Sequence, residues 1–188
     1  MFSVTKFGKE LDKNNYTWDE KNKIFSTKEN CLVLDFYDYD RVTFNTGFGC
    51  TFGARNYCIF NTGSDCIFNT VSFCHFNTSS HCTFATGNYC IFNTGFCCIF
   101  KTSSDCVFNT GSDCTFNTNS DCTFKTGENC VVIRRDVKGV IEIPVKKTIK
   151  LNDYKISGYT EIKEEIKKTN CEGKVVEIEG KKYKLVSV

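Results

Sequence analysis

The chain has 188 residues, with an unusual excess of 14 Cys and 18 Phe. A formal net charge of +2 gives no support for nucleic-acid or membrane binding from bulk electrostatics. No run reaches the roughly 20 apolar residues of a membrane span, and no apolar core of a secretion signal follows the first Lys. We therefore expect a cytoplasmic protein whose cysteines are reduced.

Residues 1–33 alternate apolar and polar side chains around Asp and Asn residues. Such alternation is typical of short strands joined by tight turns. We predict a small N-terminal β cap at residues 1–33. Its only Trp, Trp18, is expected to anchor the packing of this cap.

An eight-residue repeat occupies the middle of the chain. Cys recurs every eighth residue and Phe follows two places later, in units such as CIFNTGSD from Cys58. Two apolar residues two positions apart lie on the same face of a strand, and the Thr, Ile or Val between them favours a strand. Gly-Ser-Asp is typical of a turn, in which Gly can supply a positive φ. Each unit therefore predicts one short strand and one corner.

Alternate units differ from each other, which indicates how many units make one coil. After Thr, one class has mostly Gly, at Gly47, Gly63, Gly95, Gly111 and Gly127, whereas the other class varies freely. Stacked coils of two units would align residues 16 apart and keep the classes separate. The prediction is an all-β fold, a two-sided parallel β-solenoid of about 16 residues per coil, with small β caps at both ends.

The interior of such a solenoid would contain one Cys and one Phe from each strand. Cys acts here as a small buried apolar residue, and the Asn after Phe can form stacked amide ladders. The predicted core ladder consists of Cys50, Cys58, Cys66, Cys74, Cys82, Cys90, Cys98, Cys106, Cys114, Cys122 and Cys130 with Phe44, Phe52, Phe60, Phe68, Phe76, Phe84, Phe92, Phe100, Phe108, Phe116 and Phe124.

One corner of the predicted coil carries an aromatic column. The residue before Cys in one class of unit is Tyr57, Phe73 and Tyr89, and acidic residues occupy this position further along the chain. Exposed aromatic residues in a row are typical of protein contact sites, although they can also simply stack on one another. These three residues are the candidate binding site. The expected partner is another protein, with self-association as an alternative.

The octad register ends after Cys130, and Pro144 marks the next predicted boundary. We predict the solenoid at residues 34–143 and a small basic C-terminal β module at residues 144–188. The basic character is clear in residues 131–188, which contain fourteen basic and nine acidic groups. Residues 160–169 fit either a helix or a strand.

The last residues, VVEIEGKKYKLVSV, predict a β-hairpin with a turn centred on Gly180 and Lys181. This turn would place two apolar pairs on one face of the hairpin. The predicted pairs are Ile178 with Tyr183 and Val176 with Leu185.

The units TGSDCIFNT, TGSDCTFNT and NSDCTFKT resemble octapeptide-repeat proteins of uncharacterised phage and other microbial genomes, over residues 42–130. This resemblance implies a phage-encoded protein, either a virion component or a modulator of a host protein, in the virion or the host cytoplasm. The units are distantly similar to pentapeptide-repeat proteins, whose inward-facing residues include a small one two places before Phe or Leu. That family's period of five argues against transferring its square coil.

Residue patterns for catalysis or metal binding are weak. The sequence contains no nucleophile elbow, P-loop or zincin motif, and the cysteines are eight apart instead of the two to four of zinc sites. His75 and His81 fit the repeat as surface variants. Cys97, out of register beside Cys98, is a candidate reactive thiol or an inert corner residue. We expect no enzyme activity, metal or cofactor.

Two alternatives to a structural or protein-interaction role remain. Outward Thr and Asn ranks, as at Thr115, Asn117 and Thr123, resemble part of an ice-binding face, although Ile59 and His75 interrupt them. Inhibition of a nucleic-acid enzyme, in the manner of pentapeptide-repeat proteins, would need a strongly acidic face. Residues 34–130, with four basic and eight acidic groups, provide a poor one.

Overall fold

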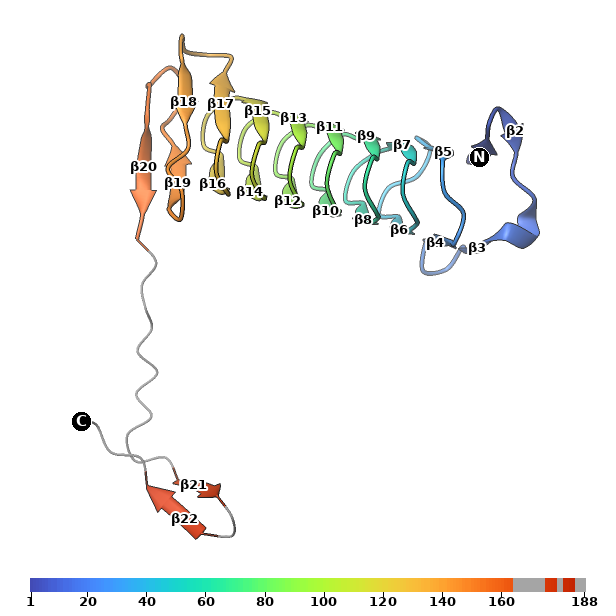
Figure 1. Ribbon diagram of the computed structural model, residues 1–188. Helices are drawn as coiled ribbons and strands as arrows, with labels where there is room; N and C mark the ends of the chain where they lie inside the picture. Colours follow the sequence, from blue (N-terminus) through green and yellow to red (C-terminus); the bar gives the residue numbers. More distant parts are fainter. Residues whose placement is uncertain (164–174, 179–180, 185–188) are drawn as a thin grey trace.

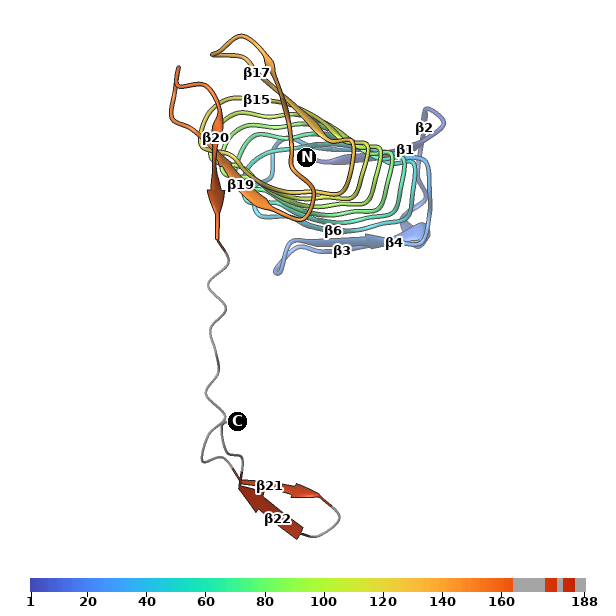
Figure 2. The same ribbon diagram turned by 60° about the vertical axis from the view of Figure 1, so that its left-hand side comes forward.

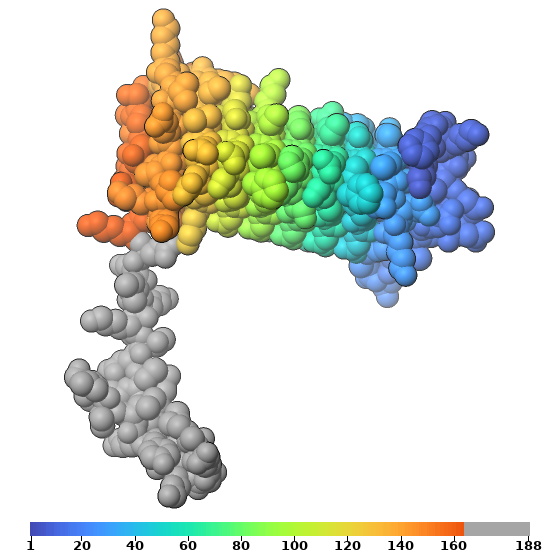
Figure 3. All heavy atoms as spheres, viewed as in Figure 1, coloured from blue at the N-terminus to red at the C-terminus, as the bar shows by residue number. Residues whose placement is uncertain are grey.

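The computed structural model in Figure 1 describes residues 1–163 and the strands β21 (Val175–Ile178) and β22 (Lys181–Lys184). Residues 1–163 contain a β-solenoid of about seven coils with about 16 residues per coil, with antiparallel strands at both ends, which confirms the predicted fold. Figure 2 shows the coils superposed, and Figure 3 shows an unbroken rod. Among the described residues, no helix has the length and apolar character that crossing a membrane requires.

Two sheets face each other across the rod. We name them sheet A and sheet B. In spatial order, sheet A contains β2 (Lys9–Glu10), β1 (Ser3–Lys6), β5 (Leu32–Phe36), β7 (Thr51–Ala54), β9 (Ile67–Asn69), β11 (Thr83–Ala85), β13 (Ile99–Lys101), β15 (Thr115–Thr118), β17 (Val131–Arg134) and β18 (Val140–Glu142). Sheet B contains β3 (Tyr16–Asp19), β4 (Ile24–Thr27), β6 (Thr43–Asn45), β8 (Ile59–Asn61), β10 (His75–Asn77), β12 (Ile91–Asn93), β14 (Val107–Asn109), β16 (Thr123–Lys125), β19 (Thr148–Leu151) and β20 (Tyr159–Ile162).

Strands 16 residues apart pair in parallel, so equivalent residues of alternate octads stand beside each other. Phe76, for example, pairs with Phe60 on one side and Phe92 on the other. Consecutive octads alternate between the sheets, because each corner carries the chain from one sheet to the other. Two octads therefore complete one coil.

The interior consists of two interlocking Phe columns. Within a sheet, the rings of Phe60 and Phe76 are stacked with centroids 4.9 Å apart. Across the sheets, the rings of Phe68 and Phe76 meet edge to face at 5.2 Å. Both arrangements are favourable for aromatic pairs. Every Phe and Cys of the core ladder is buried, none more than 2% exposed.

Backbone carbonyl groups surround the buried thiols. The Sγ of Cys66 lies 3.4 Å from the carbonyl oxygen of Ser64 and 3.8 Å from that of Gly47. The same arrangement recurs at Cys114, whose Sγ is 3.4 Å from the Ser112 oxygen. Cys fits this position because it fills the narrow end of the coil and still offers a weak donor to the corner.

The corners correct one prediction about glycine. Positive φ occurs at the residue before Cys, as at Asp65 (φ 60°) and Cys97 (φ 55°), whereas Gly63 and Gly111 have no positive φ. A Cβ on Gly111 would lie 3.0 Å from the carbonyl carbon of Gly95 in the preceding coil. Close backbone stacking therefore favours Gly at these corners, although Ser79 occupies the same position in one coil. The left-handed residue is instead the one before Cys, which is itself Gly at Gly49 (φ 67°).

The N-terminal cap ends the parallel ladder with antiparallel strands. Strand β1 pairs with β5 on sheet A, and β3 pairs with β4 on sheet B. Phe2 stacks on Phe36 with centroids 4.4 Å apart, and Trp18 meets Phe36 edge to face at 5.7 Å. These aromatic side chains cover the open end of the Phe columns, which would otherwise contact water.

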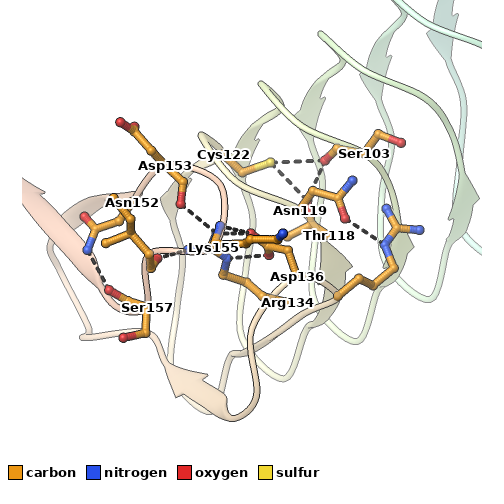
Figure 4. A network of polar contacts seen from close by, with 12 residues as sticks. Ser103, Thr118, Asn119, Cys122, Arg134, Asp136, Asn152, Asp153, Lys155 and Ser157 are labelled. Atoms are coloured by element: carbon orange, nitrogen blue, oxygen red, sulfur yellow. Dashed lines mark hydrogen bonds and ion pairs between the residues drawn. The ribbon is translucent and has the colours of Figure 1, made fainter.

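The C-terminal end is closed by antiparallel strands and a buried ion pair (Figure 4). The Arg134 guanidinium donates to both carboxylate oxygens of Asp136, and to the carbonyl oxygens of Ile156 at 2.7 Å and Asp153 at 3.1 Å. The Lys155 amide donates to the same carboxylate at 2.8 Å. The hydrogen bonds from Arg134 lower the pKa of Asp136. These hydrogen bonds compensate the positive charge of Arg134, which is buried in the last coil.

The predicted C-terminal hairpin is present with a different register. Strand β21 pairs antiparallel with β22, with Ile178 opposite Lys181 and Val176 opposite Tyr183. The predicted pair of Ile178 with Tyr183 was therefore wrong, because the observed register moves the partner of each β21 residue by two positions along β22. Leu185 lies outside the described residues. Of residues 160–169, residues 160–162 belong to β20 and residues 164–169 lie outside the described residues.

Candidate interaction site

Tyr57, Phe73 and Tyr89 form a continuous column on one corner of the rod, which we call the aromatic column. Neighbouring ring centroids are 4.9 Å apart, with angles between ring planes of 13° and 11°. The three residues are 49%, 40% and 50% exposed. The column therefore presents three parallel rings to solvent at the spacing of the coils.

The backbone explains this arrangement. Each of the three residues precedes a buried Cys and has a φ of 57–60°, a left-handed conformation that directs the side chain away from the corner. The amides of Tyr57 and Phe73 donate to the carbonyl oxygens of Ser72 and Asn88 at 3.1 Å, in the next coil. The rings are thus attached to a corner that hydrogen bonds hold from both sides.

Charged residues lie at both ends of the aromatic column. The Arg41 guanidinium lies 5.6 Å from the ring centroid of Tyr57, a distance at which a cation is attracted to the ring face. Beyond Tyr89, the same corner position is occupied by Asp105 and Asp121. The Asp121 carboxylate is 3.2 Å from the Lys150 ammonium. The corner is therefore positive at one end, aromatic in the middle and acidic at the other end.

The opposite corner is similar in backbone and different in side chains. It has the same positive φ at His81 and Cys97, but its exposed aromatic residues Phe48 and Phe96 are separated along the corner. Phe96 meets the His81 ring edge to face at 5.2 Å. This corner does not repeat the aromatic column, and it offers a matched control surface on the same rod.

The other residues that the sequence analysis considered for catalysis or metal binding do not lie together in one site. His75 points outward from β10, and His81 lies at a corner that feeds sheet A. Within the described part of the chain, no group of three or more His, Cys, Asp or Glu is arranged to hold a metal ion. The pKa of Cys74 is raised by its thiol neighbours Cys58 and Cys90 and by desolvation. The thiols of this interior column are buried and inaccessible to solvent.

Cys97 is exposed beside buried Cys98, and Cys31 is exposed as well. Cys31 was not singled out in the sequence, although it also has a positive φ of 57° and stands one coil before the Gly49 position. Cys31 lies outside the eight-residue spacing of the other cysteines, and this feature of the sequence could have identified it.

The sheet faces carry ordered polar and apolar ranks. On sheet B, the amide groups of successive coils form a ladder in which Asn77 donates to Asn61 at 3.0 Å and Asn93 donates to Asn77 at 3.0 Å. Thr115 belongs to β15 on sheet A, whereas Thr123 belongs to β16 on sheet B. These two threonines face opposite sides of the rod and do not form one array.

The aromatic column is thus an exposed feature with a regular geometry, in which neighbouring ring centroids are 4.9 Å apart. No protein-family model matches the chain, and no curated protein or solved structure shows significant similarity to it.

Proposed function

We propose that this β-solenoid is a non-enzymatic structural scaffold that binds a partner protein through the aromatic column. The observation that carries this proposal is the parallel stacking of three half-exposed rings, with centroids 4.9 Å apart, on a hydrogen-bonded corner. Aromatic side chains contribute disproportionately to protein interfaces. Rings that are already ordered lose little further conformational freedom on binding.

The orientation of the rings favours a protein over a nucleic acid or a sugar. Phe73 lies between Tyr57 and Tyr89, and Arg41 lies over the Tyr57 ring, so most of the ring faces in the column are covered. Nucleobases bind aromatic platforms through a free ring face. The column offers ring edges and the two Tyr hydroxyl groups instead, which fit an apolar groove with polar groups at its rim. A grooved protein surface is the matching partner.

The charges at the ends of the column supply orientation. A partner with an acidic group near Arg41 and a basic group near Asp105 would dock in one direction along the corner. We further propose that the protein is phage-encoded, a virion component or a modulator of a host protein, acting in the host cytoplasm. The resemblance of the octapeptide units is the support for that origin.

The alternative functions stay predictions with simple tests. An ice-binding protein would produce thermal hysteresis in a purified sample, and we expect none because the Thr ranks are divided between two sheets. An inhibitor of a nucleic-acid enzyme would slow a gyrase or polymerase assay, and we expect no effect because the rod lacks a strongly acidic face.

Photo-cross-linking tests the proposed function directly. Benzoylphenylalanine placed at Tyr57 or Tyr89, in the cells that produce the protein, should cross-link one specific protein. The same group at Phe48 or Phe96 on the opposite corner is the matched control, since these residues are 51% and 50% exposed. A partner found from the aromatic column and not from the control corner supports the proposal.

Loss of binding should then follow the same surface. The triple variant Tyr57→Ser, Phe73→Ser, Tyr89→Ser should abolish capture of the identified partner, whereas Phe48→Ser with Phe96→Ser should retain it. Circular dichroism checks that both variants are folded. Equal capture by the two folded variants, or cross-links that do not differ between the corners, would contradict the proposal.

A further inference from the structure

The outer face of sheet A carries a second ordered surface, apart from the aromatic column. One row of residues runs along the whole face, and every member is β-branched. Strand pairing aligns these residues, which we call the β-branched row: Val33, Thr51, Ile67, Thr83, Ile99, Thr115 and Val131. Three of them are half exposed, with Val33 at 51%, Ile67 at 50% and Ile99 at 56%. Thr alternates with the apolar residues along this row, which gives sheet A a partly apolar outer face that can serve as a contact surface.

A second row lies two residues further along the same strands. Its members are Asp35, Gly53, Asn69, Ala85 and Lys101, which strand pairing aligns in this order. We call it the Asp35–Lys101 row. It is acidic at the N-terminal end, small or neutral in the middle and basic toward the C-terminal end. Its charge therefore reverses along the rod.

Tyr37 forms a raised feature on the Asp35–Lys101 row. Its ring lies directly on Gly53, where an added Cβ would be 2.5 Å from the ring carbon Cε2. The Tyr37 hydroxyl donates to the carbonyl oxygen of Asn69 at 3.5 Å, and the Tyr37 amide donates to Asp35 Oδ1 at 3.2 Å. Desolvation and the Asp35 charge raise the pKa of the Tyr37 hydroxyl. The ring is thus held flat on the sheet as a fixed protrusion.

A hollow lies immediately beside this protrusion. It is shallow and open to solvent, with a volume of about 360 Å³. Small residues at Ala85 and Gly87 leave the space open, and the cationic side chains of Lys101 and Arg135 are on its rim. The complete lining is Asn69, Thr70, Val71, Ala85, Thr86, Gly87, Lys101 and Arg135. Asn69 therefore separates a protrusion on one side from a hollow on the other.

We infer that a second copy of this chain packs on sheet A, with the two rods antiparallel and the two-fold axis running along β9. This rotation places β7 opposite the partner's β11 and β5 opposite the partner's β13. Tyr37 then enters the hollow over the partner's Ala85, and Asp35 faces the partner's Lys101. Ile67 lies on the axis and contacts the partner's Ile67. Each contact occurs twice, as an isologous interface requires.

The alternative two-fold arrangement fits poorly. An axis along the rod would place each coil opposite the same coil of the partner, so Tyr37 would meet the partner's Tyr37. The hollow beside Ala85 would stay empty, and Asp35 would be near the partner's Asp35 without a cation. Like charges in contact are unfavourable at an interface. Shape and charge therefore both select the antiparallel arrangement.

The size of this contact predicts a weak dimer. In the proposed register the strands from β2 to β17 of sheet A overlap with the partner, over roughly 40 Å at about 4.8 Å per strand. A face about three residues wide buries roughly 900 Å² in total, at the low end for specific interfaces. We expect a dissociation constant on the order of 10–100 µM. This self-association uses the outer face of sheet A, whereas the proposed function uses the exposed rings of the aromatic column. The two surfaces adjoin, because Val71 and Gly87 of the hollow lie on the corner that carries Phe73 and Tyr89.

Sedimentation equilibrium on the full chain, from about 5 µM to 1 mM, tests the inference. We expect a monomer–dimer equilibrium that Ile67→Arg weakens at least tenfold, because the substitution occurs twice at the axis. Ile59→Arg on the outer face of sheet B is the matched control, at 39% exposed, and should leave the equilibrium unchanged. A wild-type chain that stays monomeric at 1 mM overturns the inference, as does equal weakening by both variants.

Charge exchange tests the register. Asp35→Lys and Lys101→Asp should each weaken the dimer, and the double variant should restore it, because each site faces the other across the axis. Failure of the double variant to restore the dimer overturns the antiparallel register. Loss of the dimer in the folded Tyr57→Ser, Phe73→Ser, Tyr89→Ser variant would place the interface at the aromatic column and overturn the assignment to sheet A.

Cross-linking on the axis gives a second, independent readout. In a Cys31→Ser, Cys97→Ser, Cys171→Ser background, which removes the two exposed thiols of the described residues and the one thiol outside them, Asn69→Cys should form a disulfide-linked dimer on mild oxidation. Asn61→Cys on sheet B is the matched control and should remain monomeric on a non-reducing gel. Equal cross-linking of the two variants overturns the inference.

Discussion

The interior columns and the corner columns of this rod repeat with the same period and differ in how strictly they repeat. Inside, the Phe position is identical from Phe44 to Phe124, and each ring is packed above, below and across. At the corner, the residue before Cys changes from Tyr57 to Asp105 while its φ stays near 60°. The interior repeats because each side chain fills the same volume between equivalent neighbours. The corner repeats only a backbone conformation, which leaves its side chains available for other roles.

The largest expected difference between these two environments lies in one pair of adjacent thiols. Cys97 is exposed at a corner and Cys98 is buried in the interior. Cys97 should react with a thiol reagent at once. Labelling of Cys98 requires opening of the coil and should be at least about 10³-fold slower, given typical stabilities of 5–15 kcal/mol. Mass spectrometry of timed, quenched labelling measures both sites.

The same experiment extends to the whole chain. Cys31 should label together with Cys97, and the buried cysteines should label only after denaturation without reductant. Similar labelling rates at Cys97 and Cys98 would show that the interior is not closed to solvent.

The second comparison uses two phenylalanines that lie three residues apart on either side of Cys74. Phe76 is fully buried, and Phe73 is 40% exposed in the aromatic column. Phe76→Ala should lower the free energy of unfolding by about 3–5 kcal/mol, because it removes ring contacts on three sides and leaves a cavity. Phe73→Ala should cost less than about 1 kcal/mol, since its ring is half in water. Urea denaturation of both variants checks this, and equal costs would contradict the division into interior and corner.

Glycine at the corner provides a smaller effect with a backbone cause. Gly111→Ala places a Cβ 3.0–3.1 Å from backbone atoms of Gly95 and Phe96. We expect a loss of about 1–3 kcal/mol, because backbone atoms of the neighbouring coil cannot move aside without disturbing the ladder. Ser103→Ala, at the equivalent position of the other corner, is the control and should change stability by less than about 0.5 kcal/mol. Thermal or urea unfolding that ranks the two variants in the opposite order would refute steric stacking as the reason for Gly.

The smallest effect is expected at the left-handed corner residue itself. Asp65 has a φ of 60°, a conformation that Gly and Asp tolerate and β-branched residues do not. Asp65→Gly should be neutral within a few tenths of a kcal/mol, whereas Asp65→Val should destabilise the protein by about 1 kcal/mol. Their urea midpoints should therefore differ clearly. Identical midpoints would mean that the corner relaxes out of the left-handed conformation.

Much of the solenoid was predictable because its interactions repeat. A spacing of 16 residues between similar octads predicts which strands pair, and the Cys-x-Phe unit predicts which side chains face inward. The aromatic column was recognisable for the same reason, since Tyr57, Phe73 and Tyr89 are spaced by one coil. Stacking at a fixed period turns a sequence pattern into a spatial one.

Features that occur once were not predictable in this way. The contact of Tyr37 with Gly53 and the buried pair of Arg134 with Asp136 each join residues without a repeated counterpart. The role of Gly111 also differed from the prediction, because its neighbour is the backbone of another coil. The register of β21 with β22 also differs from the predicted one. Such contacts depend on local geometry that periodicity does not encode.

The sequence by itself determined the period, the two-sheet cross-section and the composition of the interior, since these follow from apolar residues recurring at a spacing that only stacked coils can bury. Only the tertiary structure decided where the left-handed residue lies in each corner, how the rod ends are closed, and which surface is raised or hollow. The physical reason is that each coil buries the same side chains against equivalent neighbours, so the sequence period is enough to predict the interior. A cap, a protrusion or a hollow instead depends on one set of residues that meet only in the folded chain.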